Sequence, residues 1–116
     1  MKRDWDYIRD LLLAIENEED IYSRQSGGEE NIFFYHLQLL TEKGYIIGPS
    51  IGTYMNGSKY VNPVEPRLSM EGHDLLDTLR SQGLWERIKA GSKERGIELT
   101  FESIKIAAAH FLPKMF

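Results

Sequence analysis

The sequence contains no cysteine, which excludes disulfides and thiolate metal sites. It also contains no apolar run close to the ~20 residues that a membrane-spanning helix needs. The first ten residues, MKRDWDYIRD, are charged throughout and lack the apolar stretch of a signal peptide. We therefore expect a cytoplasmic protein that has no association with a membrane.

An excess of basic residues is missing as well, since the formal net charge is −4. Residues 1–42 carry four basic and ten acidic side chains, whereas residues 43–116 carry ten basic and eight acidic ones. Nucleic-acid-binding proteins usually have a basic domain or stripe, because phosphate contacts supply most of their affinity. The charge balance therefore argues against DNA binding without excluding it.

The chain has 116 residues, of which 41% are hydrophobic and 28% charged, an ordinary composition for one globular domain with its own core. We expect residues 1–82 to form the main domain. Residues 83–116 are expected to form a helical extension, either packed on the same domain or used for dimerisation.

The spacing of apolar residues predicts two helices in the acidic part of the chain. The first covers residues 4–18, and its predicted inward face is Trp5, Ile8, Leu11, Leu12 and Ile15. The segment IYSRQSGG that follows is expected to be strand or loop. The second helix covers residues 29–43 and is expected to end at Gly44 in a left-handed turn.

Residues 45–69 are rich in β-branched and aromatic residues, interrupted by Gly, Pro and Asn, which predicts two or three strands. Asn56-Gly57 is the strongest hairpin signal in the sequence. We expect a tight turn there, in which both residues can adopt positive φ.

Helical spacing returns in the last part of the chain, where three helices are predicted. The first covers residues 70–81 with Ser69 as its N-cap, and its expected buried stripe is Gly72, Leu75, Leu76 and Leu79. After an interruption at Gly83, a short basic helix is expected over 85–95. Thr100 is then expected to cap a helix that continues toward the C-terminus.

Two faces can be assigned to the predicted helix 29–43. The inward positions are Ile32, His36 or Leu37, and Leu40, whereas Asn31, Phe34, Tyr35 and Gln38 lie on or near the outward face. Asn and Gln side chains can recognise adenine edges, and an aromatic ring can contact a thymine methyl group. The alternative is that the aromatic residues belong to the core or pack against a neighbouring subunit.

The C-terminal helix has a wider apolar arc than one small core requires, which points to a partner, most simply a second copy of the chain. The candidate dimer interface is Ile104, Ala108, Phe111, Leu112 and Met115.

Catalytic and metal-binding motifs are weak. The sequence Gly48-Pro49-Ser50-Ile51-Gly52 matches the nucleophile elbow G-x-S-x-G, but a hairpin rather than a helix is expected after it. The three histidines, His36, His73 and His110, fall on three different predicted helices without metal-ligand spacing. We therefore expect no enzymatic activity, no metal and no cofactor.

Several segments together resemble a small family of uncharacterised phage and bacterial proteins, related to the YjcQ-like winged-helix proteins. These segments are MKRDWDYIRDLLLAIE, FYHLQLLTEKGYI, RLSMEGHDLLDTLR, LWERIK and LTFESIKIAAAHFL. A broader similarity to MarR- and ArsR-type repressors rests on YHLQLLTEKGYI alone. The resemblance implies a winged helix of phage or prophage origin and carries no catalytic residue.

The expected fold is therefore α+β, a winged helix with a β-hairpin wing followed by C-terminal helices. The first functional hypothesis is a DNA-binding transcriptional regulator that binds double-stranded DNA as a homodimer. The second is a phage protein-interaction module that engages a host or anti-phage defence protein and does not bind DNA. The candidate nucleic-acid-binding residues are Asn31, Phe34, Tyr35, Gln38, Lys43, Lys59 and Arg67.

Overall fold

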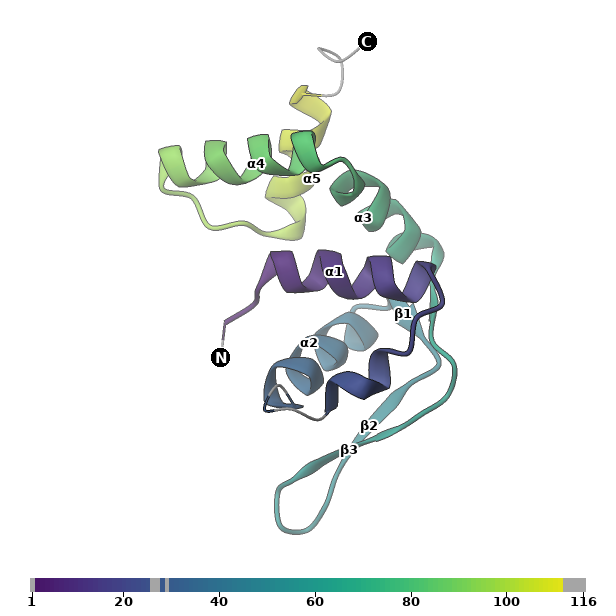
Figure 1. The fold of residues 1–116 in the computed structure, drawn as a ribbon. Helices are drawn as coiled ribbons and strands as arrows, with labels where there is room; N and C mark the ends of the chain where they lie inside the picture. The colour runs from purple at the N-terminus through teal and green to yellow at the C-terminus, as the bar shows by residue number, and fades with distance from the viewer. Residues whose placement is uncertain (1, 26–27, 29, 112–116) are drawn as a thin grey trace. The chain divides into compact units, whose positions relative to one another are not determined.

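A computed structural model describes residues 2–25, 28 and 30–111 (Figure 1). The chain divides into two compact units, residues 1–74 and residues 75–116. Five α-helices, one 3-10 helix and two small antiparallel sheets make the described chain α+β. In the same described ranges, no helix has both the length and the apolar character needed to cross a bilayer.

Helix α1 (Trp5–Glu16) begins at Asp4, whose carboxylate accepts hydrogen bonds from the backbone N–H groups of Asp6 and Tyr7. This is the N-cap arrangement that satisfies the free N–H groups of a first helical turn. The buried face contains Ile8, Leu11, Leu12, Ala14 and Ile15. The predicted helix and its inward face are confirmed, except that Trp5 is only half-buried.

A 3-10 helix, η1 (Ile21–Gln25), follows α1, so the expectation of a strand or loop for residues 21–25 is wrong. Asp20 starts it by accepting a hydrogen bond from the N–H of Tyr22 at 3.0 Å. Ile21 is buried, and the hydroxyl of Tyr22 donates to the carbonyl of Val64. The short helix therefore depends on contacts with residues distant in the sequence.

Helix α2 (Glu30–Glu42) buries Phe33, His36, Leu37 and Leu40. The expectation that Ile32 faces inward is wrong, because its side chain is 38% exposed and Phe33 fills the core position. Gly44 ends the helix with φ +78°, and the N–H of Tyr45 bonds back to the carbonyl of Leu40 at 2.9 Å. The predicted left-handed turn at Gly44 is confirmed.

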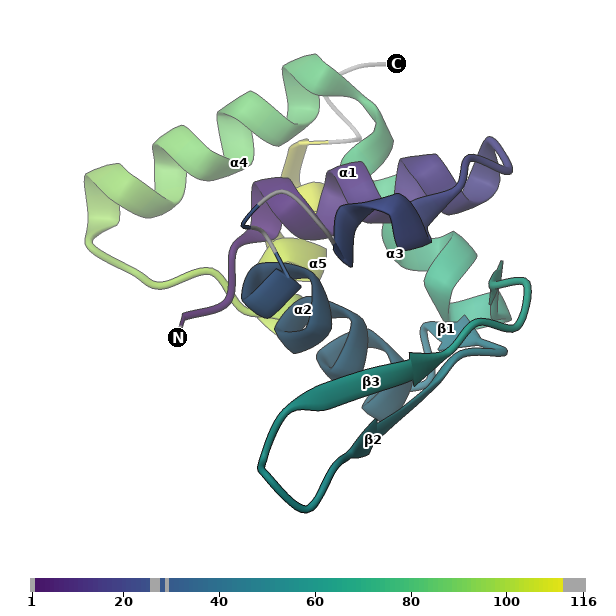
Figure 2. The same ribbon diagram turned by 60° about the horizontal axis from the view of Figure 1, so that its bottom comes forward.

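The four strands form one long, interrupted hairpin (Figure 2). At its base β1 (Ile46–Ile47) pairs with β4 (Arg67–Leu68), and farther out β2 (Ser50–Thr53) pairs with β3 (Lys59–Asn62). Helix α2 packs against β1 and β2. The hairpin is therefore fixed at its base to the helix that precedes it.

The hairpin turn lies at the predicted place. The N–H of Tyr54 bonds to the carbonyl of Ser58 at 2.8 Å, and the N–H of Gly57 bonds to the carbonyl of Tyr54 at 2.9 Å. This is the three-residue loop in which a turn is followed by a left-handed glycine. Gly57 has φ +89°, whereas Asn56 does not adopt positive φ and instead accepts a hydrogen bond from the N–H of Ser58. The expectation of positive φ at both residues is therefore wrong.

Helix α3 (Met70–Arg80) begins at Ser69, whose Oγ accepts a hydrogen bond from the N–H of Gly72 at 3.0 Å and donates to the carbonyl of Gly44. Gly72 approaches the chain so closely that a Cβ there would lie 2.1 Å from the carbonyl oxygen of Tyr45. The N-cap and the buried stripe of Gly72, Leu75, Leu76 and Leu79 are confirmed.

Helix α4 (Gln82–Arg95) starts three residues earlier than expected, because Ser81 caps it by accepting from the N–H of Leu84. The predicted interruption at Gly83 is therefore wrong. Helix α5 (Phe101–Phe111) begins as predicted: Thr100 Oγ1 accepts from the N–H of Ser103 at 3.0 Å, and Ser103 Oγ accepts from the N–H of Thr100 at 2.8 Å.

Candidate nucleic-acid interface

The candidate interface consists of the outer face of α2 and the hairpin that follows it. Asn31 is exposed in the first turn of α2, whereas Phe34, Tyr35 and Gln38 are half-buried. The ring of Phe34 lies 5.5 Å from that of Phe33, measured between centroids. Phe34 and Tyr35 thus cover the core with one side of their rings, and only part of each ring is available to a ligand.

Gln38 has a partner on its own helix. Its Nε2 donates to Glu42 Oε1 at 3.2 Å, one helical turn further along. A base edge would compete with this exposed carboxylate for the Gln38 amide. Asn31 has no such contact in the described part of the chain, so it is the better placed of the two amides for contacting a base.

The three candidate cations are exposed at three different positions. Lys43 follows α2 and leads into β1, and Arg67 lies opposite Ile47 in the register of β1 and β4. Lys59 lies farther out on β3, where its Nζ donates to Thr53 Oγ1 across the hairpin at 2.8 Å. The fold therefore places one cation beside the end of α2, one at the base of the hairpin and one near its tip.

Acidic side chains offset these cations. Glu30 is exposed in the first turn of α2, Glu42 in the last turn, and Glu65 just before β4. The elements that form the candidate interface thus carry as many exposed carboxylates as candidate cations. Phosphate binding would be weaker here than on a basic surface.

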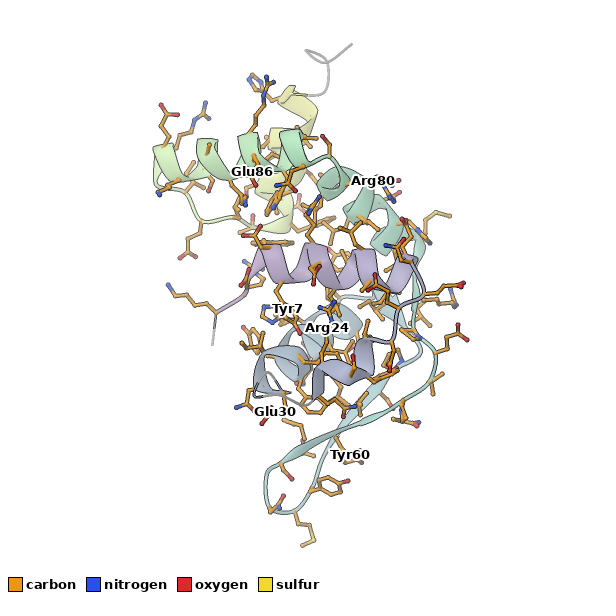
Figure 3. The ribbon with its side chains drawn as sticks, viewed as in Figure 1. Tyr7, Arg24, Glu30, Tyr60, Arg80 and Glu86 are labelled. Carbon is orange, nitrogen blue, oxygen red and sulfur yellow. The ribbon has the colours of Figure 1, made fainter. Side chains whose placement is uncertain are left out.

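Sequence reasoning missed the aromatic group near the hairpin tip. Tyr54 is 57% exposed and Tyr60, labelled in Figure 3, is 42% exposed, with ring centroids 4.6 Å apart. Met55, next to Tyr54 in the sequence, is fully exposed. Tyr60 lies across the backbone of Gly52, where a Cβ would meet the tyrosine ring at 2.1 Å. The sequence alone did not give this pairing, because a two-residue turn at Asn56-Gly57 would place Gly52 opposite Val61, whereas the three-residue loop places it opposite Tyr60.

Buried polar contacts hold α2 in place behind this face. The Nε2 of His36 accepts a hydrogen bond from the N–H of Asp4 at 2.8 Å. Its Nδ1 therefore carries the proton and donates to the carbonyl of Ile32 at 2.8 Å. The imidazole joins α2 to the start of α1 and is occupied by this structural role.

In the same unit, Arg24 of η1 forms an ion pair with Asp10 at 3.0 Å, and its guanidinium lies 5.8 Å from the ring centroid of Tyr7 (Figure 3). Burial, and secondarily the charge of Asp20, raises the pKa of Tyr22 above its ordinary value. The two contacts of Arg24, with Asp10 and with Tyr7, attach η1 to α1.

The other sequence candidates do not assemble into a site. Ser50 of the G-x-S-x-G match lies in strand β2, where the nucleophile elbow would require a strand-to-helix turn. Across the described ranges, no three His, Asp or Glu side chains are grouped as metal ligands would be.

The candidate dimer residues fall into two sets. Ile104 and Ala108 are buried within the chain, which accounts for them as core residues. The side chain of Phe111, together with Leu112 and Met115, lies outside the described residues. The homodimer remains a prediction.

The chain can be compared with known families on this basis. The sequence profile of a family described as "Hypothetical protein (DUF2513)" matches residues 2–98. The chain belongs to the DUF2513 family. It is also similar to an uncharacterised protein of Haemophilus influenzae (strain ATCC 51907 / DSM 11121 / KW20 / Rd), with 28% identity over 120 residues, covering 99% of this chain and 98% of the relative. No solved structure matches this chain, residues 1–116. The family match spans α1, α2, the hairpin, α3 and α4, and it leaves α5 outside.

Proposed function

We propose that residues 1–82 of this DUF2513 chain form a winged-helix domain that binds double-stranded DNA as a transcriptional regulator. The observation that supports this most directly is the order and packing of α1, η1, α2 and the hairpin. In a winged helix, a bracing helix precedes the helix that enters the major groove, and a hairpin wing follows it. Here η1 takes the place of the bracing helix and α2 that of the reading helix.

The proposal assigns separate roles to the two parts of the interface. Asn31, with parts of the Phe34 and Tyr35 rings, would contact base edges and thymine methyl groups in the major groove. Lys43, Lys59 and Arg67 would contact phosphates and set the orientation of the domain. The Gln38 amide can contribute only if it leaves Glu42.

Salt dependence tests the proposal with one clear number. Three phosphate contacts should give a log–log slope of binding against salt of about −2.7, and Lys59→Ala should flatten it by about one unit. Binding is measured by fluorescence anisotropy on a library of random duplexes. Lys105→Ala is the matched control, because Lys105 is exposed on α5, outside the proposed interface, and its loss should leave the slope unchanged.

Base reading is tested separately. Asn31→Ala should relax the preference at one base pair by roughly 1–3 kcal/mol and leave the salt slope as it was. Binding that is micromolar or weaker to every duplex at ~50 mM salt, with no base preference, would contradict the DNA proposal.

A second candidate function, docking to a protein partner, is favoured by the exposed Tyr54, Met55 and Tyr60 at the hairpin tip. Exposed aromatic residues are typical anchors of protein interfaces. A host or anti-phage defence protein is the partner class that the sequence resemblance suggests. In that case Tyr60→Ala should weaken partner binding by about tenfold or more, with little dependence on salt, whereas Lys59→Ala should have little effect.

A further inference from the structure

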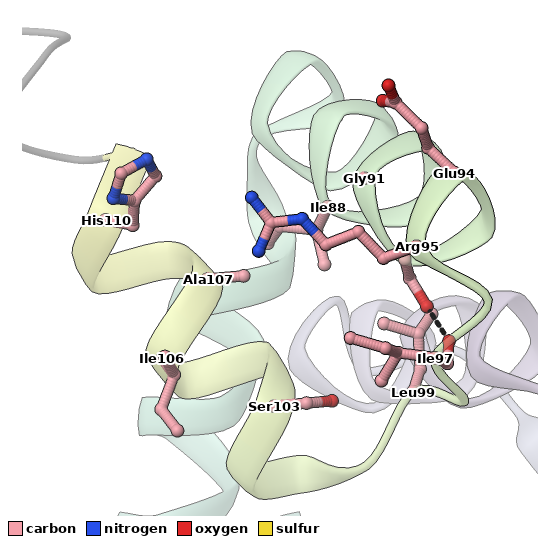
Figure 4. A pocket seen from close by; sticks show the side chains of 11 residues that line it. Ile88, Gly91, Glu94, Arg95, Ile97, Leu99, Ser103, Ile106, Ala107 and His110 are labelled. Carbon is pink, nitrogen blue, oxygen red and sulfur yellow. Dashed lines mark hydrogen bonds between the residues drawn. The ribbon is translucent and has the colours of Figure 1, made fainter.

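A cleft of about 540 Å³ lies between α4 and α5 (Figure 4). All its lining residues belong to the second compact unit, from Ile88 to His110. Its volume is within the range of pockets that hold small molecules in proteins, ~300–1,000 Å³. The cleft is separate from the proposed DNA interface, since that interface is built from α2 and the hairpin.

The connection between the two helices gives the cleft its shape. Gly96 ends α4 with φ +66°, and its N–H bonds back to the carbonyl of Lys93 at 3.2 Å. The hydroxyl of Ser92 donates to the carbonyl of Ile97, which fixes that residue at the rim (Figure 4). Thr100 then starts α5, so a short connection holds the two helices side by side.

The walls of the cleft are mostly apolar. Ile88 forms part of the buried wall, whereas Ile97 is 52% exposed and Ile106 is 70% exposed. When an apolar molecule covers large aliphatic side chains that are exposed around a concave surface, the free energy of the system falls.

One end of this apolar surface is positively charged. The guanidinium of Arg95 extends from α4 toward α5 over the cleft (Figure 4). His110 of α5 also lines the cleft. Glu94 also lines the cleft, and in the same view its carboxylate points away from the guanidinium of Arg95. A guanidinium can bind a carboxylate through two parallel hydrogen bonds.

We propose that the cleft between α4 and α5 binds a small molecule with an apolar body and one carboxylate group. The aliphatic body would cover Ile88, Ile97 and Ile106, and the carboxylate would bind Arg95. This inference is independent of DNA binding.

The probe is octanoate, and its uncharged analogue octanamide is the chemical control. Binding is followed by NMR on the isoleucine methyl groups, with Ile8 and Ile46, both buried in residues 1–74, as internal references. We expect saturable shifts at Ile88, Ile97 and Ile106 and unchanged references. Octanamide should bind about tenfold or more weakly, as should octanoate to Arg95→Gln.

Two glycines of α4 provide matched variants. Gly91 lines the cleft and Gly83 does not, and a Cβ at either position would meet no atom within 4 Å. Gly91→Leu should fill the cleft and abolish octanoate binding, whereas Gly83→Leu should leave binding unchanged. Both should fold, because each replaces a helical glycine by a better helix former where there is space.

Three outcomes would overturn the proposal. The first is the absence of saturable shifts up to about 5 mM octanoate, a concentration far above the affinity of a specific pocket. The second is equal binding of octanoate and octanamide, which would remove the role of Arg95. The third is sedimentation of the native chain as a dimer that Gly91→Leu converts to a monomer, which would make a second copy the occupant of the cleft.

Discussion

Polar contacts within the two compact units differ in the sequence separation of the residues that they join. In residues 1–74, hydrogen bonds join residues far apart in the sequence: Asp4 to His36, Tyr22 to Val64 and Gly44 to Ser69. In residues 75–116, the hydroxyls of Ser81, Ser92 and Thr100 bond to groups three to five residues away. The polar bonds of the first unit thus include several that span 25 to 42 residues, whereas these bonds at the ends of α4 and the start of α5 are local.

This difference bears on function. The non-local hydrogen bonds join α2 to the start of α1, η1 to the hairpin, and the end of α2 to the start of α3, which would hold the proposed DNA interface in one arrangement. The α4–α5 cleft, by contrast, is lined mostly by apolar side chains, which fits the small apolar ligand proposed for it.

The largest expected effect comes from Gly72→Ala. Its Cβ would lie 2.1 Å from the carbonyl oxygen of Tyr45, so α3 must move away from the end of α2. We expect a loss of about 3 kcal/mol in the free energy of unfolding, measured by urea denaturation. The matched control is Gly91→Ala in α4, where the Cβ meets no atom within 4 Å and the better helix former should add about 0.5–1 kcal/mol. Equal changes in the free energy of unfolding for Gly72→Ala and Gly91→Ala would contradict the close approach at Gly72 in the first unit and the free space at Gly91 in the second.

The next effect tests the non-local polar bonds directly. His36→Leu fills similar space but leaves the N–H of Asp4 and the carbonyl of Ile32 without the imidazole. We expect a loss of about 2 kcal/mol in the free energy of unfolding. Ser92→Ala, which removes a local bond in the second unit, should cost less than about 1 kcal/mol. A larger cost for Ser92→Ala than for His36→Leu would reverse the assignment.

The sequence predicts those features of the fold that depend on interactions between residues close together in the chain. The caps at Ser69 and Thr100, the stop at Gly44 and the position of the turn at Asn56-Gly57 are local features, and the sequence predicts each of them. The inward face of α2 differs from the expectation at one position, because Ile32, Phe33 and Phe34 are three consecutive apolar residues that fit more than one inward face.

The missed features needed tertiary information. A 3-10 helix at Ile21–Gln25 depends on the burial of Ile21 and on the bond from Tyr22 to Val64, 42 residues away. The cleft depends on the separation of α4 and α5, which no sequence spacing reports. Of the candidate interface, the residue types and the one-turn spacing of Gln38 and Glu42 are visible in the sequence, but the pairing of Lys59 with Thr53 is not, because it depends on the register of β2 and β3.

Tyr22→Phe should show a smaller effect that depends on pH. It removes the hydroxyl that bonds to Val64, so we expect a loss of about 1 kcal/mol near neutral pH. Because the pKa of Tyr22 is raised in the folded chain by burial and then by Asp20, the native state keeps its proton longer than the unfolded state does. The hydroxyl's contribution is therefore complete below pH 10 and is lost as the pH rises above it. The difference between native and variant should shrink above pH 10 in urea titrations, and a constant difference would contradict this account.

The smallest effect concerns the ends of α1 and α4. Each helix is followed by a residue in the left-handed conformation, but the residue type differs. Glu18 follows α1 with φ +58°, whereas Gly96 follows α4 with φ +66°. A side chain in this conformation costs roughly 1–2 kcal/mol, and glycine avoids that cost but loses more chain entropy on folding. We therefore expect Glu18→Gly to raise the free energy of unfolding by about 0.5 kcal/mol and Gly96→Glu to lower it by about 1 kcal/mol. Asn17→Gly, at a residue with φ −83°, is the control and should give no gain. If Glu18→Gly is destabilising, the carboxylate of Glu18 has a favourable role at the acidic end of α1 that outweighs the backbone strain.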